Sequence, residues 1–375
     1  MSKHAVMTDE MLAEARSHIG KPWKVEGDAQ FNRWAAEDPI RHYCNSIGDL
    51  NPMFRDPVYA SKTKHGCIIA PPTYLYTVYW ASGHPSGMKG IHGWHSGNLW
   101  EFFKPIKVGT CFDVTENLTR IDEKAGRMAK RIWISHGDAE YRDQNGELVA
   151  RTDGWTTWAE RGEAGKTGKY AGIEEAKYTI AELRAIEEEI LSEEIRGANP
   201  RYWEDVNVGD KLKPVVKGPL ALRDLMCYLQ GMPSPYIKAH GIWLRYERRH
   251  PDVGMIDETT GRRDAPELVH QEASRAKEIG IPGAYDYGCQ RISWLDNLLT
   301  NWMGDDGFLK KLYAEVRRFN VIGDTTWCEG KITKKYIENG EHLVDIEIWA
   351  RNQRHEVTAP GWAVVQLPSK TDKKG

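Results

Sequence analysis

Hydrophobic and polar positions follow one order twice along the chain: an apolar stretch suited to a buried helix, then extended runs rich in β-branched and aromatic residues. In the second block, helical spacing of apolar residues predicts a helix from about Gly288 to Gly304. Its apolar stripe consists of Ile292, Leu295, Leu298, Leu299 and Trp302. In the first block the counterpart is 71–80, where Pro71 and Pro72 suit a helix start because their missing N–H groups forfeit no intrahelical bond.

Tight turns are predicted between the extended runs of both blocks. An Asn-Gly pair separates two such runs at 145–146 and again at 339–340, which is a strong signal for a two-residue hairpin. A long central helix wrapped by a curved antiparallel sheet is the hot-dog arrangement. Two tandem copies of it predict an α+β double hot dog.

The two blocks are related by a nearly constant offset, which indicates a duplicated unit. Phe54 corresponds to His270, and Pro72 to Gly288, at an offset of about 216 residues. We therefore expect three segments. These are an N-terminal hot-dog domain (1–168), a helical linker (169–199) and a C-terminal hot-dog domain (200–375) with an insertion at about 233–264.

Composition and charge restrict the class of protein. The 375 residues are 40% hydrophobic and 28% charged, with a formal net charge of −3, which is typical of a soluble globular protein and argues against nucleic acid as a partner. No apolar run approaches the roughly 18 residues of a membrane span, and no signal peptide is recognisable, so a cytoplasmic protein is expected. The six cysteines form no C-x-x-C pair, so neither a metal site nor a disulfide framework is expected.

At this point the residues show a family resemblance. The first block, with YCNSIGDLNPMFRDPVYA (43–60) and IIAPPTY (68–74), resembles the MaoC-like and hydratase 2 proteins, which are R-specific enoyl-CoA hydratases and dehydratases. The second block resembles their C-terminal domain through VHQEASRAKEIGIPGAYDYG (269–288) and RRFNVIGDTTW (317–327). The resemblance implies an acyl-CoA thioester substrate and no cofactor. A double hot dog can stand alone or pair as a homodimer, and the sequence leaves both open.

The family motif is Gly-Asp-x-Asn-Pro-x-His. Hydration of a 2-enoyl thioester needs a base for the water, an acid for the α-carbon and N–H donors for the enolate-like oxygen. The first block keeps most of the motif, as Gly48, Asp49, Asn51 and Pro52. However, Phe54 occupies the histidine position, and Pro72, which has no N–H, occupies the position of the glycine that donates to the oxyanion. The N-terminal domain is therefore expected to be non-catalytic and to line an acyl or pantetheine channel.

The second block retains the complementary part of the motif. His270 is the expected general base or acid, and Gly288 the expected oxyanion donor. The aspartate position holds Ala265, so the neighbouring Asp264 is the first candidate for the partner carboxylate. Further candidate carboxylates are Asp257 and Glu258 in the insertion and Glu267 just after it. The alternative for His270 is a structural histidine.

Other residues are expected to bind substrate. The candidates near the two motifs are Tyr285, Asp286, Asp49 and Asn51. In the basic insertion, Arg245 and Arg249 could bind the phosphates of coenzyme A, although such a charge run can also be a solvated helix. Two other functions fit the fold: an acyl-CoA thioesterase, and a non-catalytic acyl-CoA-binding protein with a decayed motif.

Overall fold

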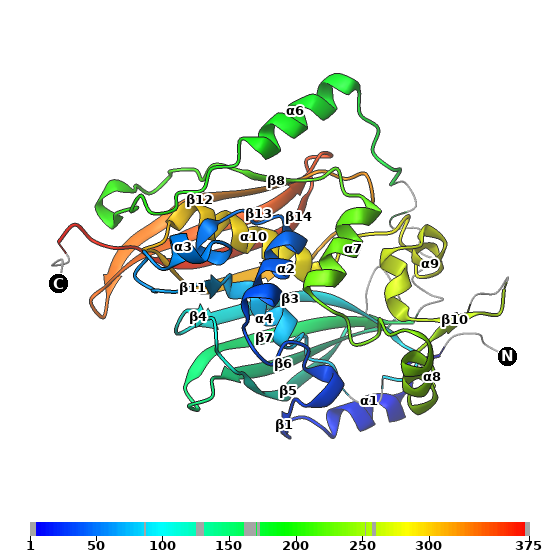
Figure 1. Cartoon of the computed structure of the whole chain (residues 1–375). Coiled ribbons are helices and arrows are strands. Elements are labelled where there is room, and N and C mark those ends of the chain that lie inside the picture. Colours follow the sequence, from blue (N-terminus) through cyan, green and yellow to red (C-terminus); the bar gives the residue numbers. More distant parts are fainter. Residues whose placement is uncertain are drawn as a thin grey trace.

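The computed structural model describes residues 5–85, 88–124, 131–160, 170, 173–251, 253–256 and 260–371. Ten strands form one antiparallel sheet in the order β1-β5-β6-β7-β3-β11-β14-β13-β12-β8 (Figure 1). The first half supplies β1 (Trp23–Lys24), β3 (His92–Phe102), β5 (Asp113–Lys124), β6 (Ile132–Arg142) and β7 (Leu148–Ala159). The second half supplies β8 (Val215–Lys217), β11 (Phe308–Glu315), β12 (Thr326–Glu338), β13 (Glu341–Asn352) and β14 (Val357–Gln366).

The two halves join at one antiparallel strand pair. Strands β3 and β11 run alongside each other from the pair Glu101 and Lys311 to the pair Gly97 and Glu315. On either side of this seam the strand order repeats, as β7-β6-β5 in the first half and β14-β13-β12 in the second. The predicted α+β double hot dog is confirmed.

The central helix of the second half is α10 (Gly288–Met303), as predicted. Every residue after Gly288 is buried, and the helix packs on strands of both halves, including β3, β11 and β12. It ends at Gly304, whose φ of 73° lies in the left-handed region that glycine adopts readily.

The central helix predicted over 71–80 in the first half is much shorter than expected. It consists of a 3-10 turn η3 (Pro72–Tyr74) and a single α-turn α4 (Leu75–Val78). The backbone becomes extended at Tyr79, and the carbonyls of Thr77 and Val78 accept bonds from the N–H groups of Asn32 and Phe31, at 3.0 and 3.2 Å. Helical continuation would require those carbonyls for itself, so tertiary hydrogen bonds end the helix.

Both predicted hairpins are present. Residues 145–146 lie in the loop between β6 and β7, and Asn339 and Gly340 alone connect β12 to β13. The φ values of Asn339 and Gly340 are 50° and 80°, the left-handed pair that a type I′ turn requires.

The remaining elements flank the sheet. Helix α2 (Glu37–Ile47) packs against α7 (Leu222–Gly231), and α6 (Ile180–Leu191) occupies the predicted linker with Thr179 as its N-cap. The other short elements are α1 (Asp9–Arg16), η1 (Gly27–Ala29), η2 (Pro52–Phe54), α3 (Pro57–Ala60), β2 (Ile69–Ala70), β4 (Ile106–Lys107) and η4 (Trp203–Asp205).

Residues 233–264, where an insertion is predicted, form short elements of their own. They contain α8 (His240–Arg249) and the hairpin of β9 (Met255–Ile256) with β10 (Arg263–Asp264), and they are followed by η5 (Pro266–His270) and α9 (Ala273–Glu278). Figure 1 shows α8, α9 and β10 at the same end of the molecule as α1. The insertion thus lies beside the start of α10 rather than along the whole sheet.

Candidate active site

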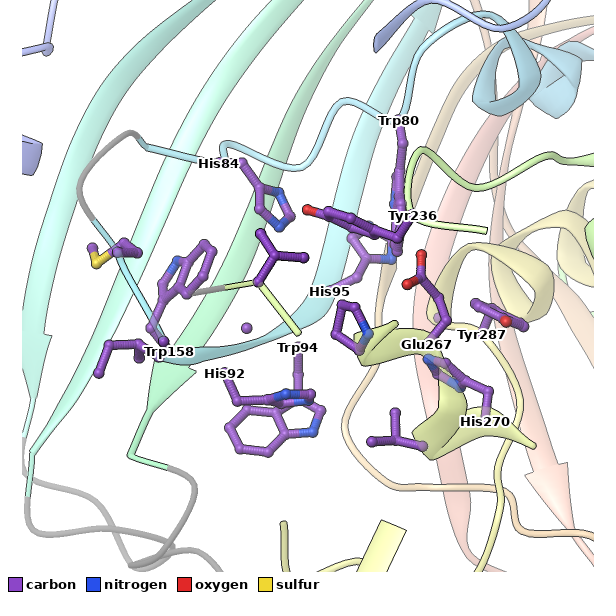
Figure 2. Close-up of a pocket in the computed structure, with 18 of the residues that line it drawn as sticks. Trp80, His84, His92, Trp94, His95, Trp158, Tyr236, Glu267, His270 and Tyr287 are labelled. Carbon is purple, nitrogen blue, oxygen red and sulfur yellow. The ribbon is translucent and has the colours of Figure 1, made fainter. Parts of the chain in front are cut away.

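A cavity of about 630 Å³ lies at the start of α10 and is walled by both halves of the chain (Figure 2). The first half contributes an aromatic wall that includes Trp80, His84, Trp94, His95 and Trp158. The second half contributes Tyr236, Arg249, Glu267, His270, Tyr285, Asp286, Tyr287 and Gly288, among others. The site is therefore assembled from segments that are distant in sequence, from Trp80 to Gly288.

The short helix η5 brings two titratable side chains to this cavity. Pro266 occupies its first turn, where a missing N–H costs nothing. Side chains three residues apart eclipse on a 3-10 helix, so Glu267 and His270 leave η5 on the same side. Figure 2 shows both on one wall of the cavity, next to Tyr287.

The His270 imidazole is held as a neutral base. Its Nδ1 lies 2.9 Å from the carbonyl oxygen of Tyr285, and since a carbonyl can only accept, Nδ1 carries the proton and Nε2 is left with a lone pair. The ring stacks on that of Tyr287 with centroids 3.9 Å apart. Burial lowers the pKa of His270 to about 4, so the imidazole stays uncharged at neutral pH.

A buried ion pair fixes the segment that supports His270. The carboxylate of Asp286 accepts two bonds from the Arg291 guanidinium, one of them at 2.8 Å, and both side chains are almost fully buried. Arg291 also donates to the carbonyl of Arg318 at 2.6 Å, and the Asp286 N–H donates to Asn320 at 3.0 Å. Asp286 therefore ties the start of α10 to the neighbouring loop, although it was predicted to bind substrate.

Gly288 is the first residue of α10 and lies on the cavity wall. N–H groups of a first helical turn have no intrahelical acceptor, and the helix dipole makes this end partly positive. A Cβ atom at this position would lie 2.9 Å from His95 Nδ1 and 3.2 Å from Val316 Cγ2. The absence of a side chain thus lets the first half of the chain approach this end of the helix closely.

Two carboxyl side chains, those of Asp286 and Glu267, line the cavity, and Glu267 is the one outside the ion pair with Arg291. Its side chain is buried, and one oxygen accepts a hydrogen bond from the Ser234 hydroxyl. The other oxygen, Oε2, has no hydrogen-bond partner. Burial raises the pKa of Glu267 to about 8, so this carboxyl is protonated at neutral pH.

The first half of the chain is similar to known proteins. Residues 30–152 match the model of the FAS1-like, dehydratase domain region. A UPF0336 protein from Parafrankia sp. is 30% identical over 152 residues, which cover 39% of this chain and 93% of the relative. The chain belongs to the MaoC-like hot-dog family.

Solved structures show the same fold over the whole MaoC-like chain. A MaoC-like dehydratase superposes with a TM-score of 0.65 at 16% identity, covering 95% of this chain and 99% of the other. A conserved double-hotdog protein of Mycobacterium tuberculosis superposes with a TM-score of 0.55 at 8% identity, covering 93% and 96%. These similarities establish the fold, and the family model matched by residues 30–152 describes a dehydratase domain region.

Not every residue predicted for the site reaches the cavity of this MaoC-like protein. His270, Gly288, Tyr285, Asp286 and Arg249 line it. Asp264 does not: it lies in β10, where its carboxylate accepts the Ala265 N–H at 2.8 Å and lies 3.5 Å from Arg262. Arg245 is exposed on α8 and is not on the wall. The candidates Asp257 and Glu258 lie outside the described residues.

The remnant of the motif in the first half also lies away from this cavity. Asp49 and Asn51 are fully buried, and the Asn51 N–H donates to the Asp49 carboxylate at 2.8 Å. Phe54 and Pro72 line a different cavity of only about 30 Å³. Asp49 and Asn51 therefore shape their own loop and do not contact the space around His270.

The sequence predicted that the first half lines a channel, but it did not single out His95. His95 bonds through Nε2 to the side-chain amide oxygen Oδ1 of Asn98 at 2.6 Å, which leaves its Nδ1 beside Gly288 without a partner. Tyr287 was also missed, although it directly precedes the glycine singled out. Within the described residues, no cluster of three or more His, Cys, Asp or Glu side chains is placed to hold a metal ion, and no helix has the length and apolarity to cross a membrane.

Proposed function

We propose that this MaoC-like protein interconverts a 2-enoyl-CoA thioester and the corresponding 3-hydroxyacyl-CoA thioester by adding or removing water. One observation carries the proposal. A neutral imidazole with a free Nε2 and the free N–H end of α10 face the same 630 Å³ cavity.

The geometry supplies two of the three requirements of the reaction. In the hydration direction, Nε2 of His270 takes a proton from water as the water oxygen adds to the β-carbon. Negative charge moves onto the thioester oxygen, where the Gly288 N–H and the helix dipole stabilise it. A positioned base contributes typically about 10²–10⁴-fold to such a rate, and an oxyanion donor about 10²–10³-fold.

The rest of the cavity fits a thioester with a large carrier group. Arg249 stands exposed on the wall that α8 forms, where a guanidinium can pair with coenzyme A phosphates. The aromatic side chains of the first half, such as Trp94 and Trp158, offer an apolar surface to the acyl or pantetheine chain. The reaction needs no cofactor beyond the coenzyme A of the substrate. The protein is proposed to act in the cytoplasm.

The test is turnover of a panel of 2-enoyl-CoA thioesters, followed by loss of enoyl-thioester absorbance. His270→Ala should abolish turnover while leaving the binding of a crotonyl-type thioester nearly unchanged. Exposed His42 is the matched control, and His42→Ala should keep full activity. Full activity in His270→Ala would refute the site. Release of free thiol from saturated acyl-CoA would identify a thioesterase instead, and thermal stabilisation without any turnover would identify a binding protein.

A further inference from the structure

We infer that Glu267 is the general acid of this site, which gives the α-carbon its proton in hydration and removes it in dehydration. The inference rests on the proposed function, because it assigns the proton donor that the reaction requires. The aspartate position of the motif holds Ala265, which caps η5, and Asp264 lies beside Arg262 and is not among the residues that line the cavity. Glu267, two residues after Ala265, therefore provides the carboxyl group.

The placement of Glu267 supports this role. It leaves η5 on the same side as His270, and both side chains line the cavity (Figure 2). Ser234 holds one carboxyl oxygen, whereas Oε2 is buried without a partner. A buried polar atom without a hydrogen-bond partner destabilises the folded protein. A substrate group that bonds to Oε2 on binding removes this cost.

The surroundings of Glu267 favour the protonated carboxyl. The phenols of Tyr236, Tyr285 and Tyr287 and the imidazoles of His95 and His270 line the cavity with Glu267, and none of these five groups is a cation at neutral pH. Of the cations on the wall, Arg291 is paired with Asp286, and Lys89 and Arg249 are exposed. The carboxyl thus carries a proton at neutral pH while the imidazole does not, which reverses their ordinary order. Environments that push two pKa values apart in this way assign an acid and a base.

The proton balance of the reaction closes with these two groups. His270 takes one proton from water, the hydroxide oxygen bonds to the β-carbon, and the π electrons move toward the thioester oxygen. The enolate then collapses, and its α-carbon takes the proton of Glu267. Transfer of a proton from the imidazolium to the carboxylate restores the starting state, so the net change is addition of one water.

The decisive variant is Glu267→Gln, which keeps the size of the side chain and an oxygen to accept the Ser234 bond. We expect kcat to fall about 100-fold or more, with thioester binding retained. The wild-type pH profile should lose activity below about pH 4, when His270 is protonated, and above about pH 8, when Glu267 loses its proton. The alkaline limb should be missing from the residual activity of Glu267→Gln.

Two further variants separate catalysis from structure. The Ser234 bond favours the carboxylate, so Ser234→Ala should move the alkaline limb to higher pH. Asp264→Asn is the matched control and should leave both kcat and the pH profile unchanged. Stability provides a readout apart from activity. Folded Glu267 holds its proton to about pH 8 and an unfolded glutamate only to 4.5, so stability declines as pH rises between these values, and Glu267→Gln should flatten that decline.

The two proposals fail in different ways. If His270→Ala is inactive but Glu267→Gln retains kcat within about threefold and an intact alkaline limb, Glu267 is a structural residue and this inference falls alone. If His270→Ala is fully active, the proposed function itself falls. Loss of kcat and of the alkaline limb in Glu267→Gln, with a normal profile in Asp264→Asn, supports the inference.

Discussion

The starts of the two central helices occupy equivalent places in the duplicated frame but have opposite properties. In the second half, His270 and Gly288 face a cavity of about 630 Å³. At the matching positions of the first half, Phe54 and Pro72 face one of about 30 Å³. The strand order is nevertheless the same in both halves. The sheet therefore preserves the same frame in both halves, and the large cavity lies at the start of only one of the two central helices described.

The same comparison extends to how each helix start is anchored. The second half uses the buried pair of Asp286 and Arg291. At the offset of about 216 residues, the first half has Ala70 and Leu75, which are both buried and apolar. An ion pair with its extra bonds to Arg318 and Asn320 holds the backbone that supports His270, whereas the first half needs only packing.

The largest effect is expected from breaking this ion pair. Asp286→Ala leaves the Arg291 guanidinium buried without its partner, and the free energy of unfolding should fall by about 3–5 kcal/mol. The double variant Asp286→Ala with Arg291→Leu copies the first half and should recover much of that loss. Chemical denaturation of both variants measures the difference. If the double variant is as unstable as the single one, apolar packing cannot replace the ion pair at this position.

The second prediction concerns a variant that carries the proline of the first half at the equivalent position of α10. Tyr287 has φ −78° and ψ 140°, a conformation that a following proline accepts. Gly288→Pro removes the oxyanion donor and should lower kcat about 10²–10³-fold, or about 2.7–4 kcal/mol. Gly288→Ala adds the same Cβ against His95 but keeps the N–H, so it reports the steric part alone. Equal losses in the two variants would count against a donor role for this amide.

These comparisons also show what the sequence could and could not predict. Local signals were sufficient for the Asn339-Gly340 turn and for α10, because glycine conformation and apolar spacing act within a few residues. The length of the first helix was not predictable, since it ends where Phe31 and Asn32 donate to its carbonyls. The motif led to His270, but the environment of Glu267 depends on Ser234, which is distant in sequence.

A third prediction asks whether the first half can regain a site. Phe54→His places the motif histidine back, but buries a polar ring among apolar side chains beside a cavity of about 30 Å³. We expect stability to fall by about 1–3 kcal/mol. In an inactive His270→Ala background, Phe54→His should restore no turnover of enoyl-CoA, because no space admits the thioester. Measurable rescue would mean that the small cavity of the first half opens in solution. The two halves would then differ less in cavity size than they do in the structure.

The smallest effect is expected at the cavity mouth, where the second half has the insertion. Arg249 and Arg245 lie on α8 one turn apart, and both are exposed, but only Arg249 lines the cavity. Arg249→Ala should raise KM about three- to tenfold at low salt with kcat unchanged, because one exposed charge pair contributes about 1 kcal/mol. The difference from wild type should shrink as salt screens the phosphates, and Arg245→Ala should match wild type throughout. Equal effects of the two variants would instead indicate a diffuse positive field over α8, with no defined contact at the mouth of the site.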